Sequence, residues 1–270
     1  ATTWHTVATQ DTRLLRMQLD TVSRLPKEQV FLNYLRCHDD IGWGLDYPTL
    51  RWWGMEEVPH KKYLNDYFRG FTGADARGEL YNEDPVTGDA RLCGTTASLC
   101  GLEGEDKDTA IRKITMLHAM MLFQSGIPVL YSGDEIGQTN DWDCKLDPNK
   151  IQDSRYLHRG KMPWEQVQAL EDPASSQAKL FRALGELETL RKTHRAFSSQ
   201  ADLWTFDTGS DQVLGIVRAH QGELLIGCFN FGESDYVLKK QSRTVRNLLT
   251  GEDYNRPITV PGFDFIWLSV

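Results

Sequence analysis

A histidine and two adjacent aspartates, His38, Asp39 and Asp40, are the residues whose types and spacing point most clearly to chemistry. They end a nearly continuous apolar run, 30–35, which is typical of a strand buried on both faces in a parallel sheet. Two carboxylates and an imidazole are costly to bury without partners. In an α/β barrel, however, the carboxyl end of a strand faces the active-site mouth. The stretch therefore predicts a strand that opens on a polar pocket, with a surface turn as the alternative.

Three separated motifs resemble, in the same order, those of the α-amylase superfamily of retaining glycosidases and transglycosidases. The stretch 33–43 (NYLRCHDDIGW) is similar to its His-Asp motif. The stretch 126–137 (GIPVLYSGDEIG), followed by Asp153-Ser154-Arg155, is similar to its eighth barrel strand. The stretch 76–95, which contains NEDPVTGDARLCGT, is similar to an insertion of the amylosucrase-like members. The resemblance covers essentially the whole chain, but only the C-terminal portion of the family's full protein.

The fold that this resemblance implies is α/β plus all-β. It combines the seventh and eighth strands of a (β/α)8 barrel with an antiparallel β-sandwich domain. The expected domains are a partial barrel (1–40, helix plus seventh strand), an insertion (41–107), the eighth strand with flanking helices (108–198) and the sandwich (199–270). Six short β-rich runs separated by turn residues also predict the sandwich from the sequence pattern alone. They lie at 203–206, 213–218, 224–229, 236–238, 258–260 and 263–268.

Helical periodicity marks three other segments. The chain up to about Arg24 predicts a helix that ends before Pro26. Asp108 is expected to cap a helix, and Asp172-Pro173 is expected to begin another. Their apolar stripes contain Ala110, Ile114, Leu117, His118 and Met121 in the first and Leu180, Leu184 and Leu187 in the second. His118 is therefore predicted to be a core or boundary histidine. A short buried strand is expected at 127–131, and the irregular stretch 41–107 predicts only short helical pieces such as 61–68.

The resemblance implies roles for individual residues. Asp39 is expected to stabilise the transition state and His38 to hydrogen-bond the same glucosyl ring, because bonds that strengthen as an oxocarbenium-like state forms lower the barrier. Asp40 and Arg155 are expected to form a bidentate salt bridge that closes the far side of the glucosyl pocket. Arg91 is expected to contact the fructosyl or acceptor side. For both arginines, an ordinary surface position is the alternative.

Other polar and aromatic residues are given structural interpretations. Asp134 and Glu135 follow the predicted eighth strand and are expected to hold loops in place. Trp52 and Trp53 are expected to pack a small core of the insertion, with a sugar-stacking platform as the alternative. The aspartates of the loop 138–164 could bind calcium, but their spacing is not that of an EF-hand, and Lys145, Lys150 and Arg155 can neutralise them. No metal and no cofactor are expected.

Composition narrows the classes of partner. The net charge of −8 and the pI of about 5.4 argue against a protein that binds nucleic acid or an anionic membrane. Five cysteines show no metal-site spacing and are expected to be reduced thiols of a cytoplasmic protein. No stretch is apolar and long enough for a membrane span.

The sequence therefore predicts the C-terminal portion of a sucrose-acting, amylosucrase-like glucosyltransferase, with sucrose and α-glucans as substrates. The nucleophile and the acid/base of retaining cleavage would lie upstream of Ala1, so the chain alone is expected to be inactive. A sucrose hydrolase, an α-glucosidase or amylase, and a non-catalytic truncated sugar-binding relative are the alternatives. Oligomeric state, acceptor and product linkage stay open.

Overall fold

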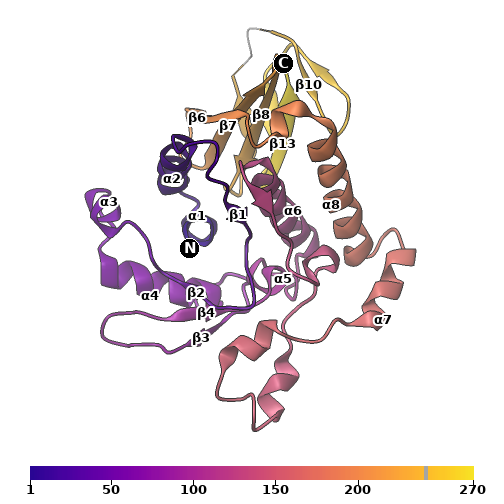
Figure 1. The fold of residues 1–270 in the computed structure, drawn as a ribbon. Helices are drawn as coiled ribbons and strands as arrows, with labels where there is room; N and C mark the ends of the chain where they lie inside the picture. Colours follow the sequence, from indigo (N-terminus) through magenta and orange to yellow (C-terminus); the bar gives the residue numbers. More distant parts are fainter. Residues whose placement is uncertain (240–242) are drawn as a thin grey trace. The chain divides into compact units, whose positions relative to one another are not determined.

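A computed structural model describes residues 1–239 and 243–270 (Figure 1). The α-helices are α1 (Thr2–Thr9), α2 (Arg13–Ser23), α3 (Tyr47–Trp52), α4 (Glu57–Phe68), α5 (Thr96–Leu99), α6 (Lys107–Phe123), α7 (Trp164–Val167) and α8 (Ser176–Thr193). Short 3-10 helices are η1 (Asp134–Ile136), η2 (Trp142–Leu146), η3 (Ser154–His158), η4 (Gln168–Glu171) and η5 (Arg195–Phe197). None of the helices in these ranges is long and apolar enough to cross a membrane.

The strands have two or three residues each in the first two thirds of the chain, and the longest strands lie in the last third. They are β1 (Leu32–Asn33), β2 (Ile41–Gly42), β3 (Glu79–Tyr81), β4 (Arg91–Cys93), β5 (Ile127–Pro128), β6 (Asp202–Phe206), β7 (Val213–His220), β8 (Glu223–Asn230), β9 (Tyr236–Leu238), β10 (Val245–Asn247), β11 (Asp253–Tyr254), β12 (Ile258–Val260) and β13 (Asp264–Ser269).

The chain forms two compact units, and each is assembled from segments that are far apart in the sequence. The first unit contains residues 1–8, 34–114 and 130–181, and the second contains 9–33, 115–129 and 182–270. The domain boundaries expected at residues 41, 108 and 199 stay a prediction.

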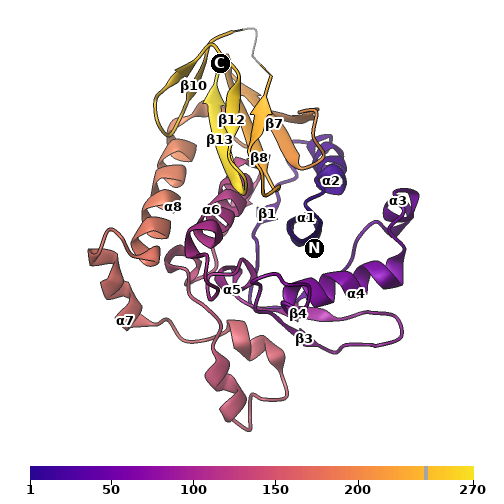
Figure 2. The same ribbon diagram turned by 180° about the vertical axis from the view of Figure 1, so that it is seen from behind.

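Antiparallel β-structure dominates the C-terminal part of the second unit (Figures 1 and 2). Six strands pair in the order β11-β10-β13-β8-β7-β6, and β12 pairs with β9 in a second, two-stranded sheet. Side chains from both sheets share one core: Val213, Cys228, Leu238, Val245, Ile258, Val260, Ile266 and Leu268. The predicted antiparallel β-domain is confirmed. Strands β10 and β11 were missed because they are short and contain polar residues, VRN and DY, so neither shows a β-rich run.

The two predicted barrel strands pair in parallel, but the expectation that they are buried is wrong. Leu32 aligns with Ile127 and Asn33 with Pro128, and the backbone N–H of Ile127 donates to the carbonyl of Phe31 at 2.8 Å. Leu32 is 63% exposed, and the neighbouring apolar side chains Val30, Phe31, Ile127 and Val129 are exposed as well. The pair forms a sheet of only two strands, so these side chains lack the neighbours that would cover a complete parallel sheet.

The insertion is more regular than its sequence predicts. It contains the twelve-residue helix α4 and the antiparallel sheet β2-β4-β3. Gly and Asp residues concentrate in the connections, which hides the short strands from a periodicity argument. The predicted packing of Trp52 is also wrong, since Trp52 is 87% exposed, while Trp53 is half-buried.

Helix ends depart from prediction more than helix faces do. The predicted N-terminal helix is interrupted between α1 and α2, where Gln10 has a φ of 56°. Asp106, not Asp108, caps α6 by accepting the backbone N–H of Thr109 at 2.9 Å. Likewise, Ser175 rather than Asp172 caps α8. The stripes of both helices are buried as predicted, and His118 is a core histidine.

Candidate functional site

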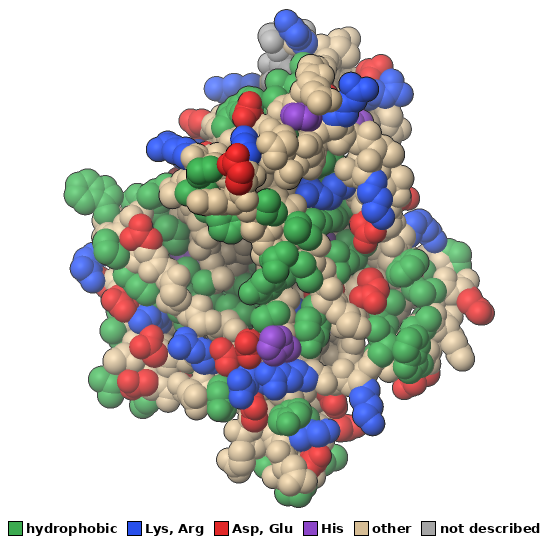
Figure 3. Space-filling model, viewed as in Figure 1, with side chains coloured by type: hydrophobic (Ala, Val, Ile, Leu, Met, Phe, Trp, Pro, Cys, Tyr) green, Lys and Arg blue, Asp and Glu red, His purple; other side chains and the backbone are tan. Residues whose placement is uncertain are grey.

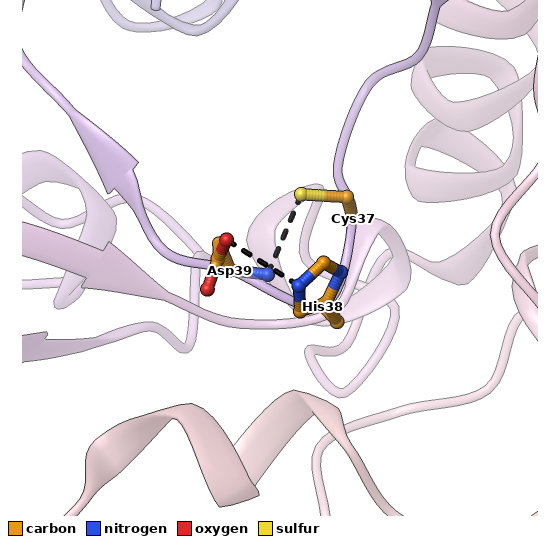
Figure 4. Close-up of side chains that lie close together, drawn as sticks. All are labelled: Cys37, His38 and Asp39. Atoms are coloured by element: carbon orange, nitrogen blue, oxygen red, sulfur yellow. Dashed lines mark hydrogen bonds and ion pairs between the residues drawn. The ribbon is translucent and has the colours of Figure 1, made fainter.

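The predicted site residues His38, Asp39 and Asp40 lie in a turn between β1 and β2, within the first compact unit. Figure 4 shows the side chains of His38 and Asp39. The side chains of His38 and Asp39 are 69% and 54% exposed, whereas that of Asp40 is mostly covered. The structure therefore presents an imidazole and a carboxylate to solvent, side by side, on a segment that continues from the end of a parallel strand.

Asp39 has different partners at its two carboxylate oxygens. Its Oδ2 lies 3.4 Å from Nε2 of His38. Its Oδ1 lies 3.5 Å from Nη2 of Arg159 and 3.7 Å from Nη1 of Arg155. Basic, acidic and histidine side chains lie next to one another on the face shown in Figure 3. Three cationic or polar groups thus lie around one exposed carboxylate.

The predicted bidentate bond between Asp40 and Arg155 does not form. Arg155 instead makes a bidentate bond to Asp153, with Nε–Oδ1 at 2.8 Å and Nη2–Oδ2 at 2.9 Å. This hydrogen bond lowers the pKa of the Asp153 carboxyl. Asp153 also accepts the backbone N–H of Arg155 at 3.0 Å, so the turn itself brings the two side chains together. A partner two residues away needs almost no loop closure, which explains why it is preferred to one over a hundred positions distant.

Arg91 is the partner of Asp40, with Nε–Oδ1 at 3.7 Å. Arg91 aligns with Gly42 in the β2–β4 pair, and a Cβ at Gly42 would collide with the Arg91 guanidinium. The missing side chain at Gly42 therefore leaves the space that Arg91 occupies. Both predicted arginines lie near the turn, but Arg91 takes the place beside Asp40 that was expected for Arg155.

Two residues that the sequence analysis missed, His158 and Arg159, hold the backbone of the turn. Nε of Arg159 donates to the carbonyl of His38 at 2.6 Å, and Nε2 of His158 lies 3.2 Å from the same oxygen. They follow Arg155 closely, yet no sequence spacing signals that they meet His38. Their effect is to fix the backbone from which His38 and Asp39 project.

A buried ion pair, Arg36 with Asp134, supports the turn through His158. Nε and Nη2 of Arg36 each lie 2.8 Å from Oδ1 of Asp134, and both side chains are almost fully buried. Oδ2 of Asp134 accepts the hydroxyl of Thr96 at 3.0 Å, and Nη1 of Arg36 donates to the carbonyl of His158 at 3.2 Å. The guanidinium also lies 4.3 Å from the centre of the Tyr131 ring. Asp134 therefore has the structural role that the sequence analysis expected.

Burial lowers the pKa of His158 to about 4. The backbone N–H of Gly94 points at Nδ1 over 3.2 Å, so Nδ1 accepts and the proton resides on Nε2, which donates to the carbonyl of His38. Protonating Nδ1 would break the bond from Gly94. His158 thus holds the turn in its neutral form.

Replacing His158 by Gln should reduce the pH dependence of stability. The folded pKa of about 4 lies below the ordinary value of 6.5, so the unfolded chain takes up the proton first as the pH falls. The contribution of His158 to the free energy of unfolding is fully present above pH 6.5. It decreases by about 3 kcal/mol as the pH falls toward 4. Urea unfolding from pH 7 to pH 4.5 measures it.

In His158→Gln, an amide replaces the titrating ring, so the loss on acidification should be smaller by about that amount. The matched control is His220→Gln, at a half-buried histidine of β7. Its free energy of unfolding should fall between pH 7 and pH 4.5 by the same amount as that of the unchanged chain. Identical pH profiles for the unchanged chain and His158→Gln would contradict the assignment.

The aspartate-rich loop 138–164 is neutralised largely as predicted. Lys150 pairs with Asp147 at 3.6 Å and Arg155 pairs with Asp153, whereas Lys145 bonds Glu79 instead of a loop aspartate. The three-ligand cluster that the described residues do form is Cys37, His38 and Asp39, whose donor atoms all lie within 4.8 Å of one another.

No protein-family model matches the chain. Among curated proteins, it is similar to glucosylglycerate phosphorylase of Escherichia coli (strain K12), with 26% identity over 170 residues, 62% of this chain and 30% of that protein. It is also similar to glucosylglycerate phosphorylase of Allomeiothermus silvanus, with 31% identity over 150 residues, 55% of this chain and 25% of that protein. The chain therefore spans between a quarter and a third of the length of these relatives.

A solved structure shares the fold over part of the chain. The crystal structure of AmyP in complex with maltose matches with a TM-score of 0.51 and 17% identity, over 64% of this chain and 38% of that one. Such a match at low identity supports the fold alone. It is consistent with a barrel fragment followed by an antiparallel β-sheet domain.

Proposed function

From the distant relationship of this chain to the carbohydrate-active enzymes of the α-amylase superfamily (GH13), we propose that it is the C-terminal portion of a retaining glucosyl-transferring enzyme. One observation carries the proposal. The Asp39 carboxylate is oriented by His38, Arg155 and Arg159 and still keeps 54% of its side chain exposed. An oriented, accessible carboxylate beside an imidazole suits a polyhydroxylated ligand.

In this proposal, Asp39 accepts hydrogen bonds from hydroxyl groups of the glucosyl ring. Those bonds strengthen as positive charge develops in the oxocarbenium-like transition state, which lowers the barrier. His38 hydrogen-bonds the same ring, and Arg155 and Arg159 prevent the carboxylate from turning away. The nucleophile and the acid/base are supplied by segments outside this chain, since retaining cleavage needs two further carboxyl groups about 5 Å apart.

Sucrose is the proposed glucosyl donor, with an α-glucan or water as acceptor. The support is the motif resemblance of 33–43 and 82–95 to amylosucrase-like enzymes. The expected closure of the pocket by Asp40 and Arg155 no longer supports it, because Arg155 bonds Asp153. Arg155 still reaches Asp39 and stacks 5.2 Å from the Tyr81 ring, so we assign it to the wall of the glucosyl pocket together with Asp153.

Phosphorolysis of a glucosylated acid is the second candidate. The two curated relatives described above are glucosylglycerate phosphorylases. Arg91, Arg155 and Arg159 surround the turn and could attract an anionic acceptor, because guanidinium groups match phosphate and carboxylate geometry. A sugar-binding relative without catalysis is the alternative from a different class.

We expect the chain alone to release no fructose from sucrose. The full-length protein that contains it should release fructose from sucrose even when no inorganic phosphate is added. Under phosphorolysis, the full-length protein would instead convert glucosylglycerate to a glucosyl phosphate only when inorganic phosphate is present. Enzymatic assays of fructose and of glucosyl phosphate measure both.

The comparison with full-length protein separates the candidates. Binding of sucrose without any turnover would favour the non-catalytic alternative. Fructose release by the isolated chain that is lost in Asp39→Ala would refute the division of the catalytic groups between this chain and the rest of the protein.

A further inference from the structure

Cys37, His38 and Asp39 place a sulfur, a nitrogen and an oxygen donor on three consecutive residues (Figure 4). Their donor atoms lie within 4.8 Å of one another, and Nε2 of His38 is already 3.4 Å from Oδ2 of Asp39. Ligand atoms around a tetrahedral zinc ion lie about 3.3–3.8 Å apart, as follows from its bond lengths of about 2.0–2.3 Å. Side-chain rotations that shorten the donor–donor distances by up to about 1–1.5 Å would therefore complete three ligand positions.

Hydrogen bonds from other segments of the chain hold the backbone that carries these donors. Arg159 and His158 bond the carbonyl of His38, and the backbone N–H of Asp39 donates to Sγ of Cys37 at 3.4 Å. The last contact keeps the thiol folded over the turn. Ligands on a fixed backbone lose less entropy on binding, because less of the chain must be ordered.

The nearby arginines do not occupy the position that an ion would take. They face Oδ1 of Asp39, whereas His38 faces Oδ2. An ion bound to Oδ2 of Asp39, Nε2 of His38 and Sγ of Cys37 would replace the weak 3.4 Å contact between His38 and Asp39. Both arginine pairs would remain, on the opposite side of the carboxylate.

We propose that Cys37, His38 and Asp39 form a binding site for a thiophilic divalent cation such as Zn²⁺. Thiolate and imidazole donors favour Zn²⁺ over Ca²⁺ or Mg²⁺, which prefer oxygen ligands. Three protein ligands leave one position for water. Binding releases the thiol proton of Cys37 to solvent as the sulfur–metal bond forms, so affinity rises with pH.

Cys37 is the accessible thiol of the chain. The other four cysteines, Cys93, Cys100, Cys144 and Cys228, are buried, and burial raises the pKa of Cys93, Cys100 and Cys228 to about 12. These four do not compete for a metal in the folded chain. If the proposed function holds, a bound ion would also occupy His38 and Asp39 and block the glucosyl ligand reversibly.

Titration of the isolated chain with Co²⁺, a spectroscopic substitute for Zn²⁺, tests the proposal. We expect a thiolate-to-cobalt charge-transfer band that saturates at one ion per chain and is displaced by Zn²⁺ but not by Ca²⁺. Cys37→Ser should abolish the band, and His38→Ala should weaken affinity by at least about 10–100-fold, the loss seen even for outer-shell partners of a metal. Cys144→Ala, at a buried thiol, should leave both unchanged.

Absence of the band in the unchanged chain, or its persistence in Cys37→Ser, would overturn the proposal. So would displacement by Ca²⁺ at similar concentrations. The readout contains no sugar and no turnover, so failure of the metal site would leave the proposed glucosyl transfer untouched, and the reverse holds equally.

Discussion

Replacing Arg36 by Met should lower the free energy of unfolding of the chain by about 3–5 kcal/mol. Arg36 and Asp134 are both almost fully buried, and two guanidinium nitrogens lie 2.8 Å from the same carboxylate oxygen. Without the guanidinium, Asp134 would be a buried charge that has lost its cation, although it would still accept the hydroxyl of Thr96. Removing one partner of a buried pair costs far more than the pair itself contributes, because the other charge stays desolvated. Urea unfolding at pH 7 measures the loss.

A double variant and a surface pair provide the controls. Arg36→Met combined with Asp134→Leu removes both charges, so it should recover most of the stability that the single change loses. Arg51→Met breaks the exposed pair of Arg51 and Glu56 and should cost less than about 1 kcal/mol. A loss below that limit for Arg36→Met, or a double variant no more stable than the single one, would show that the pair is not the main support of the turn.

Replacing Asp39 by Asn in the full-length protein should reduce kcat about 10²–10³-fold, the scale of losing one group that stabilises transition-state charge. Asn keeps the size of the side chain and can still hydrogen-bond a sugar hydroxyl, but it carries no charge to stabilise an oxocarbenium-like state. The substrate should still bind, so KM should change much less than kcat. Steady-state kinetics with sucrose, the proposed donor, give both constants.

Asp143→Asn is the matched control, since Asp143 is an exposed aspartate of the same compact unit and has no hydrogen bond or ion pair in the structure. Its kcat should equal that of the unchanged protein. An Asp39→Asn enzyme with full kcat, or with a raised KM alone, would assign Asp39 to substrate binding and not to the transition state.

The position of the turn could be predicted from sequence because its residues are adjacent in the chain. His38, Asp39 and Asp40 do lie in the turn that follows β1 along the chain, and Arg91 and Arg155 do reach the same turn. The partner of each arginine could not be predicted. A motif places residues in a region, but the choice between Asp40 and Asp153 depends on a local turn that brings Asp153 within 2.8 Å of Arg155.

Burial was the least predictable property. An apolar run indicates that a strand could be covered, but whether it is covered depends on segments that the run itself does not contain. Leu32 and Ile127 pair with each other and remain exposed. The bonds of His158 and Arg159 to the His38 carbonyl were missed for a related reason: side-chain to backbone contacts across 120 positions leave no periodic pattern.

The alternation of the two compact units along the chain has a consequence for the order of folding. The second unit needs residues 9–33 and also β13, near the last residue of the chain. Within it, the carboxylate of Asp20 in α2 accepts the hydroxyl and the backbone N–H of Thr205, 185 positions later. During synthesis, the early segments must therefore wait while most of the chain emerges, and closing such distant contacts is slow. A single cut anywhere between residues 9 and 181 would also divide both units, because neither is contiguous.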